Sequence, residues 1–332
     1  MSEITIPKPD VSLLWRTDLH LSDFTPQSRR DDWTETLLGK IRQIGRIASD
    51  QGSDVVIDGG DFFDIKSPSR NSHRLVQAAM SAHSEYPCPV YACVGNHDCK
   101  FGDRKFLPEQ PLGVLFQSGV FGRLYDEHEL VIRSESVTVR VVGVPYHGVR
   151  YDMDLFRAIK KGDEDYLVVV GHVLASRKGG SMFEGEDIIK YSDLTEVCPD
   201  ADVFCFGHWH KNQGIEQLKS GQWVVNVGSL SRGSLSQDNL DRIPVVVSMG
   251  FTEDGITLNE IEIEVAPAEE VFDVEGRQRA EERSNAMEAF VATIQIALAN
   301  QNTKSLEEGV MEMGDIPHTV KERVISYLES AG

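Results

Sequence analysis

Five apolar segments of the chain are each followed directly by side chains that commonly bind metal ions. In chain order, these residues are Asp18 and His20; Asp61; Asn96, His97 and Asp98; His172; and His208 and His210. Ligands of α/β folds bind at the carboxyl ends of strands, where the chain leaves the sheet. If the apolar segments are strands, these side chains meet at one edge of the fold and form a metal site.

The residue types indicate which metals and which reaction the site would serve. Carboxylate, imidazole and amide donors without a thiolate suit Mn²⁺, Fe or Zn²⁺. Two ions about 3.5–4 Å apart could share Asp61 and hold a bridging hydroxide for in-line attack on phosphorus. Any single fragment, such as Gly-Asp, is common in turns that bind nothing. The five fragments in this order favour a metal site, and the glycines before the ligands would let the backbone approach it closely: Gly60, Gly95, Gly171 and Gly207.

The elements that must hold these residues alternate between strands and helices. Short apolar segments at 11–17, 54–60 and 90–96 predict strands. Segments 33–52 and 69–85 space their apolar residues three and four apart, as amphipathic helices do. The alternation is typical of β-α-β units, and the strand-rich stretch from VTVRVVGVPY to GITLNEIEIEV predicts a second sheet packed on the first. We therefore expect an α/β fold, a two-sheet β-sandwich flanked by helices.

The pattern changes after Pro267. Residues 275–301 predict one long helix and residues 318–330 a shorter one. We therefore divide the chain into a catalytic domain at 1–266 and a C-terminal helical segment at 267–332. The pattern leaves open whether these helices dock a partner protein or pack on the core of their own chain.

Bulk composition limits the classes of function. No apolar segment approaches the ~20 residues needed to cross a bilayer, and the N-terminus lacks the features of a signal peptide. The five cysteines form no Cys-x-x-Cys pair, which favours reduced thiols in a cytoplasmic protein. The net charge of −20 argues against a general nucleic-acid-binding surface, because polyanion binding uses clustered Lys and Arg.

Other acidic and histidine residues have simpler explanations. Asp64 is expected to support the metal ligands without binding a metal, and Asp58 to be part of its strand. His147, in the segment VPYHG, is a candidate for a position near the site. The remaining histidines are expected on the surface or on helix faces: His73, His83, His128 and His318.

The ordered ligand set resembles the signature of the calcineurin-like metallophosphoesterase superfamily over about residues 11–230. The resemblance implies a sandwich of that type with two divalent metal ions. Carried over position by position, it puts one ion on Asp18, His20, Asp61 and His210. It puts the second ion on Asp61, Asn96, His172 and His208. His97 would then be the acid that assists the leaving oxygen, oriented by Asp98.

Four segments look like a narrower branch, the meiotic-recombination-eleven and SbcD-type DNA repair nucleases: GGDFFDIKSPSRNSH, VGVPYHG, FGHWHK and NVGSLSR. This resemblance implies Mn²⁺-dependent cleavage of DNA during end processing, recombination or repair. It also implies a homodimer and a partner ATPase of the SMC-like coiled-coil type. The chain length is closer to that of the bacteriophage members, for which the location would be the bacterial host cytoplasm.

Two other functions fit part of the pattern. A small-molecule phosphodiesterase or phosphatase with the same two ions suits the acidic composition better, but it leaves the Pro-Ser-Arg segment at 68–70 unexplained. A binding scaffold without turnover would not need the complete ligand set. We expect the nuclease, with basic residues near the predicted loops supplying local phosphate contacts: Arg70, His73, Arg74, Lys100, Lys105, Arg177, Lys178, Lys211 and Arg232.

Overall fold

The computed structural model describes residues 9–64, 71–181, 185–274, 276, 311 and 321–322. It divides into two compact units, Met1–Phe272 and Asp273–Gly332, and all the helices and strands named below belong to the first. Helix α7 (Ala268–Val271) therefore falls in the first unit, slightly beyond the predicted boundary at 266. The Pro-Ser-Arg segment at 68–70 and nearly all of the two predicted C-terminal helices lie outside the described residues. The functional division of the chain stays a prediction.

The first large sheet has the strand order β15-β14-β1-β2-β3-β4. Strands β1 to β4 run parallel to one another, whereas β14 and β15 pair antiparallel at one edge. The strands are β1 (Val11–Arg16), β2 (Val55–Asp58), β3 (Val90–Ala92), β4 (Phe121–Arg123), β14 (Val245–Thr252) and β15 (Gly255–Glu262).

The second large sheet has the order β12-β13-β11-β7-β6-β5. Its four central strands are parallel and its two edge strands are antiparallel to their neighbours. The strands are β5 (Leu130–Arg133), β6 (Thr138–Val144), β7 (Tyr166–His172), β11 (Val203–Gly207), β12 (Gly214–Gln217) and β13 (Trp223–Asn226). A small third sheet joins β8 (Ala175–Ser176), β9 (Gly180–Ser181) and β10 (Asp187–Lys190).

The helices begin where a side chain satisfies the first free backbone N–H groups. Asp32 caps α1 by accepting a hydrogen bond from the Glu35 N–H at 3.0 Å, and Ser72 caps α2 by accepting from the Leu75 N–H at 3.0 Å. The helices are α1 (Trp33–Asp50), α2 (His73–His83), α3 (Pro111–Gln117), α4 (Met153–Arg157), α5 (Tyr191–Val197) and α6 (Gln237–Asp241), besides α7. None of the described helices combines the length and the apolar character needed to cross a membrane.

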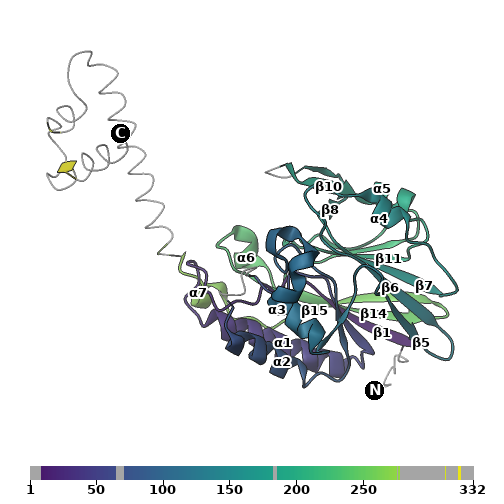
Figure 1. Ribbon diagram of the computed structural model, residues 1–332, viewed down its shortest axis with the longest axis horizontal. Coiled ribbons are helices and arrows are strands. Elements are labelled where there is room, and N and C mark those ends of the chain that lie inside the picture. Colours follow the sequence, from purple (N-terminus) through teal and green to yellow (C-terminus); the bar gives the residue numbers. More distant parts are fainter. Residues whose placement is uncertain are drawn as a thin grey trace, which may run out of the picture. The chain divides into compact units, whose positions relative to one another are not determined.

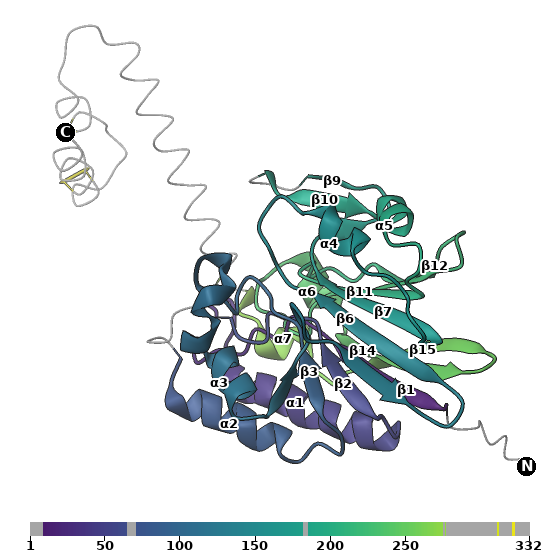
Figure 2. The same ribbon diagram turned by 45° about the vertical axis from the view of Figure 1, so that its right-hand side comes forward.

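The two large sheets pack face to face, with α1 and α2 outside the first and α4 and α5 outside the second (Figures 1 and 2). Side chains alternate between the layers, as the period of a strand requires. On β1, Leu13 and Trp15 pack between the sheets, whereas Leu14 packs in the cluster that contains α1. On β7, Val168 points into the layer between the sheets and Val169 packs with the cluster under α4 and α5. The predicted α/β fold with two sheets is confirmed.

A buried ion pair lies under the first sheet, where the sequence indicated a strand residue and a histidine on the surface or on a helix face. Arg16 donates from Nε to Asp58 Oδ2 at 2.7 Å and from Nη1 to the Tyr86 hydroxyl at 2.9 Å. Its Nη2 lies 2.9 Å from His83 Nε2, and the His83 ring is buried. Burial and then the charge of Arg16 hold the pKa of His83 well below its usual value, so the ring is neutral. Of the two positions expected for His83, the surface or a helix face, the structure shows the second, on α2, where its ring completes the partners of a buried guanidinium.

The Arg16–Asp58 pair also supports the chain segment that leads to Asp61. Asp58 Oδ1 accepts a hydrogen bond from the Gly60 N–H at 3.0 Å, one residue before Asp61. Burial raises the pKa of the Asp58 carboxyl even though the guanidinium lies beside it. The attraction between the two charges therefore does not fully offset the free energy lost when both are removed from water. A single buried charge without its partner would cost still more.

Asp58→Asn should destabilise the fold by about 3–5 kcal/mol, because it leaves the Arg16 charge buried without its counter-ion. Urea unfolding followed by circular dichroism would measure the change. The matched control is Glu35→Gln, which breaks the exposed Arg42–Glu35 pair and should cost only about 0–1 kcal/mol. Equal losses in the two variants would show that the buried pair is not a special support of the fold.

Candidate metal centre

The carboxyl ends of five strands meet at one edge of the sandwich and bring the predicted ligands together. Strands β1, β2 and β3 of the first sheet lead to Asp18 and His20, to Asp61, and to Asn96. Strands β7 and β11 of the second sheet lead to His172 and to His208 and His210. All seven predicted ligands thus come from strand ends, and both sheets contribute to the site.

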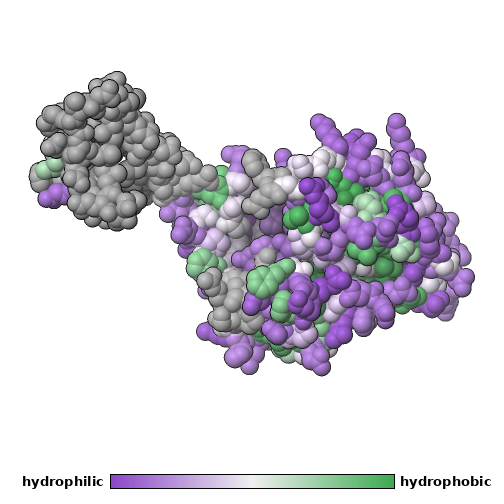
Figure 3. Space-filling view, turned by 45° about the horizontal axis from the view of Figure 1, so that its top comes forward, coloured by the Kyte–Doolittle hydropathy of each residue, from purple (hydrophilic) through white to green (hydrophobic). Residues whose placement is uncertain are grey.

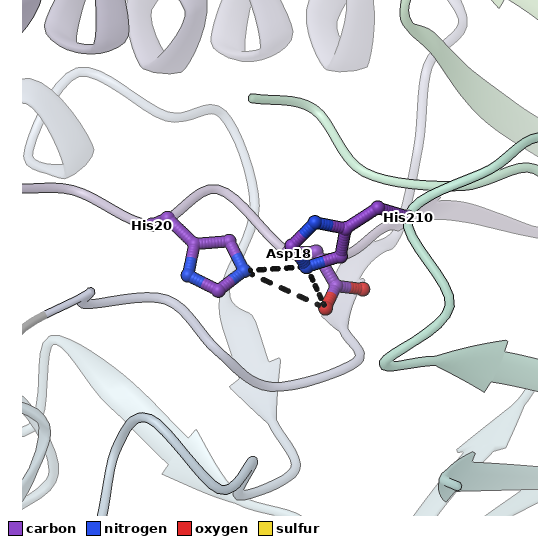
Figure 4. Close-up of side chains that lie close together, drawn as sticks. All are labelled: Asp18, His20 and His210. Carbon is purple, nitrogen blue, oxygen red and sulfur yellow. Dashed lines mark hydrogen bonds and ion pairs between the residues drawn. The ribbon is translucent and has the colours of Figure 1, made fainter. Parts of the chain in front are cut away.

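The first group of donors consists of Asp18, His20 and His210, which point toward one another in Figure 4. The Nε2 atoms of His20 and His210 lie 3.9 and 3.8 Å from Asp18 Oδ1, and 3.0 Å from each other. Asp61 Oδ2 lies 3.8 Å from His20 Nε2 and so joins this group. Two imidazole nitrogens and two carboxylate oxygens at these separations can surround one divalent cation.

The second group gathers on the other side of the Asp61 carboxylate. His172 Nε2 lies 3.3 Å from Asp61 Oδ2 and 3.2 Å from Asn96 Oδ1. Asp61, His172 and His208 also form a group whose ligand atoms all lie within 4.8 Å of one another. Its imidazole, carboxylate and amide donors suit a second cation.

The shared oxygen itself supports the fit of two metal ions. Asp61 Oδ1 accepts the His97 N–H at 2.7 Å, but the fully buried Oδ2 accepts no hydrogen bond from any residue that the structure describes. A buried carboxylate oxygen without a partner is costly, and a cation between the two groups would satisfy it. Burial would raise the pKa of Asp61, but the charges of His172 and His20 outweigh this and keep its pKa well below the usual value.

The backbone at the site adopts conformations that most residues avoid. Of the six described non-glycine residues with positive φ, four are predicted ligands: Asp18 at 54°, His20 at 53°, Asp61 at 52° and His208 at 87°. A left-handed conformation at such residues is uncommon and costs about 1–3 kcal/mol each. The fold stores this strain where the strand ends must turn their donor atoms toward one point.

Only some of the glycines next to the ligands have the predicted role. A Cβ on Gly95 would lie 2.1 Å from Asp61 Oδ1, so only glycine allows the two strand ends to approach this closely. Gly171 does not have this role, because a Cβ there would meet its nearest neighbours at an ordinary 3.4 Å.

His97 lies beside the first group, with its ring 4.7 Å from that of His20. Its Nδ1 is 2.8 Å from the Asp64 carbonyl oxygen and 3.3 Å from Asp64 Oδ1. Partial burial would lower the pKa of His97, but the hydrogen bond with Asp64 and the charge of Asp61 raise it to about 9. The contacts with Asp64 thus favour the protonated ring, which can donate a proton.

The carboxylate that orients His97 is Asp64 rather than Asp98, which corrects the sequence-based assignment. Asp98 instead accepts hydrogen bonds from the backbone N–H groups of Asp61, Gly95 and Phe63 at 2.8, 2.9 and 3.2 Å. These bonds tie the end of β2 to the end of β3. Asp64 also contacts His20 Nδ1 at 3.2 Å, in agreement with the expected support of a ligand.

Glu186 belongs to the site but has no sequence signal that identifies it. Its Oε1 lies 3.0 Å from His208 Nε2 and accepts a hydrogen bond from the Tyr151 hydroxyl at 2.7 Å. A carboxylate on one ring nitrogen fixes the orientation of a histidine whose other nitrogen faces a metal. Glu186 follows Gly185, but no strand-like apolar segment leads into it, so only its position in space connects it with His208. His147, the other open candidate, bonds with Pro145 and Asp152 through its two ring nitrogens.

Comparisons with known proteins agree with this geometry. One relative is the DNA double-strand break repair protein Mre11 of Methanosarcina mazei, whose sequence is 24% identical to this chain over 235 residues. That match covers 69% of this chain and 34% of the relative, so the chain spans about a third of the length of the relative it matches.

Two solved structures match this chain. A dimetal phosphatase from Danio rerio has a TM-score of 0.51 at 11% identity, with 76% of this chain and 96% of that chain covered. The protein TT1561 of Thermus thermophilus has a TM-score of 0.45 at 13% identity, with 75% and 98% covered. The first supports the fold. The model of the calcineurin-like phosphoesterase family matches residues 13–212, more than half of the chain and every predicted ligand, and the chain therefore belongs to that family.

Proposed function

We propose that this protein is a Mn²⁺-dependent DNA nuclease that hydrolyses phosphodiester bonds in DNA end processing, recombination or repair. The observation that carries the chemistry is the buried Asp61 carboxylate, which lies between two groups of metal-type donors. The substrate class rests on the similarity to a protein named for double-strand break repair.

Two divalent ions, when bound, would supply Lewis-acid activation of water and neutralise charge on the phosphoryl oxygens. In our proposal, Asp18, His20, Asp61 and His210 hold one ion. Asp61, Asn96, His172 and His208 hold the other. Asp98 keeps the strand ends in register, and Asp64 and Glu186 orient histidines of the site.

His97 would act as the general acid of the reaction. Its ring lies beside the donor groups, and the contacts with Asp64 hold it and favour its protonated form. We propose that it donates its proton to the sugar oxygen as the bond to phosphorus breaks.

We also propose that the protein works with a coiled-coil ATPase of the SMC-like type, as a homodimer. Support comes from the branch that the sequence resembles and from the charge of −20, which makes DNA binding by this chain alone weak. The ATPase would then supply much of the DNA affinity.

The same charge favours a second candidate, a small-molecule phosphodiesterase or phosphatase with the same two ions. A panel of nucleotides, cyclic nucleotides, aryl phosphodiesters and DNA separates the two functions, because they share the metal chemistry and differ in substrate.

Mn²⁺-loaded protein should degrade linear DNA slowly alone and faster with its ATPase partner, and chelation should abolish the activity. The reason is that phosphodiester hydrolysis depends on the cations, whereas DNA capture depends on the partner. Gel analysis of end-labelled DNA would measure this. Hydrolysis of an aryl phosphodiester with intact DNA, even in the presence of the partner, would rule out the nuclease.

His97→Ala should lower kcat on DNA about 10²–10⁴-fold while both metal ions remain bound, because the proton donor is lost and the ligands are kept. His97→Gln is the matched variant, since it keeps a polar side chain that cannot protonate. Single-turnover assays and metal analysis would report the two properties. Loss of metal in either variant would instead make His97 a ligand.

Glu186→Gln should weaken metal binding by about 10–100-fold, because His208 loses the carboxylate that orients its ring. Titration calorimetry with Mn²⁺ would measure the affinity. Glu196→Gln, on the exposed face of α5, is the control and should bind metal as the wild type does. An unchanged affinity in Glu186→Gln would refute the positioning role.

A further inference from the structure

The segment Cys99–Phe106, which we call the aromatic–basic loop, exposes a phenylalanine beside the metal centre. It follows Asp98 directly and contains two short 3-10 turns, Lys100–Gly102 and Arg104–Glu109, the second of which continues beyond the loop. The Phe101 side chain is 80% exposed, more than any other large hydrophobic side chain that the structure describes. An aromatic ring gains free energy by burial, so its exposure here points to a ligand that covers it. Hydrophobic side chains occur only in small patches on the largely hydrophilic face drawn in Figure 3.

The backbone of Phe101 shares a property with the metal ligands. Its φ is 59°, and the only other described non-glycine residue with positive φ, besides the four ligands, is Asp126. A bulky aromatic residue rarely adopts this conformation, and residues that do so gather at functional sites. Phe101 thus has both a strained backbone conformation and an apolar ring exposed to water.

A basic side chain lies beside each of two aromatic rings in the loop. The rings of Phe101 and Phe106 meet edge to face with centroids 5.9 Å apart. Lys100 Nζ lies 5.2 Å from the centre of the Phe101 ring and 5.9 Å from that of Phe106, and Lys105 Nζ lies 4.9 Å from that of Phe106. An aromatic face beside ammonium groups is the arrangement that binds single-stranded nucleic acid, with a base on the ring and a phosphate on the cation.

The loop is one side chain away from the metal centre. Gly102 packs against Tyr146 so closely that a Cβ on Gly102 would lie 3.2 Å from Tyr146 Cε1. The Tyr146 ring in turn lies 5.4 Å from the His208 ring. A surface pocket opens beside the loop. It is lined by Gly102, Asp103, Arg104, Lys105, Tyr125, Asp126 and His147.

We propose that Phe101, together with Phe106 and Lys100, stacks on an unpaired nucleobase of the strand held at the metal centre. This inference rests on the proposed nuclease function and adds a substrate preference for single-stranded or frayed DNA. The choice of a nucleobase follows from Lys100, whose ammonium group lies within 5.9 Å of the centres of both rings. Lys105 is paired with Asp103 at 2.6 Å, so Lys100 is the cation that would meet a phosphate. In a chain with a net charge of −20, a cation beside an exposed aromatic ring favours an anionic ligand with flat rings.

Phe101→Leu and Phe101→Trp form a matched pair, because both variants keep apolar bulk at the same strained position and only Trp keeps a stacking face. Fluorescence anisotropy would measure their affinity for two single-stranded 12-mers with phosphorothioate linkages, which resist cleavage. One 12-mer carries bases throughout and the other has a run of abasic sites. We expect Phe101→Leu to bind the base-containing strand roughly 5- to 150-fold more weakly than wild type. Phe101→Trp should bind it as wild type does, and the three proteins should bind the abasic strand alike.

Three results would contradict the proposed stacking site. These are wild-type affinity in Phe101→Leu, an equal loss on the abasic strand, and conversion of a wild-type dimer to monomers in Phe101→Leu with DNA affinity unchanged. The last would assign the loop to a contact between two copies of the chain. The DNA cleavage assay with Mn²⁺ tests the proposed function separately. If the wild type cleaves DNA but Phe101→Leu binds the base-containing strand as the wild type does, only the stacking site is refuted. If Phe101→Leu binds that strand more weakly but the wild type does not cleave DNA, only the nuclease function is refuted.

Discussion

Buried negative charge is the constraint on which the rest of this structure depends. Four carboxylates are buried at or beneath one edge of the sandwich: Asp18, Asp58, Asp61 and Asp98. Each buried charge must be compensated, and the fold does so in different ways. Arg16 pairs with Asp58, and three backbone N–H groups bond with Asp98. The Thr17 hydroxyl and the His208 N–H bond with Asp18, but one oxygen of Asp61 is left for a cation.

This division separates two carboxylates that shape the site from Asp61, which two bound ions would share in our proposal. Asp58 and Asp98 accept hydrogen bonds from protein groups, and these bonds fix the chain on either side of Asp61. Asp61 faces the rings of His20, His172 and His208 instead of a permanent positive charge. The affinity of the proposed site for cations would therefore depend on its surroundings as much as on its ligands.

Much of this could be predicted from the sequence, because strand ends and ligand types leave a regular pattern. The alternating apolar segments predicted the two sheets, and the residues after them predicted which side chains converge. The roles of Asp98, Glu186 and His83 could not be predicted in the same way. Each depends on a contact between segments that are distant along the chain or on which of two neighbouring carboxylates turns toward a ring. Such contacts follow from packing in three dimensions and have no spacing rule.

The origin of the ligands in both sheets has a thermodynamic consequence. Asp18, Asp61 and Asn96 extend from one layer of the sandwich, and His172 and His208 extend from the other. Cations bound there would join by coordination two layers that are packed together by apolar side chains. Any species that binds only the folded state raises its stability with concentration. The free energy of unfolding would then rise with the concentration of metal ions in the surroundings. The metal centre would thus stabilise the packing of the two layers as well as provide the chemistry.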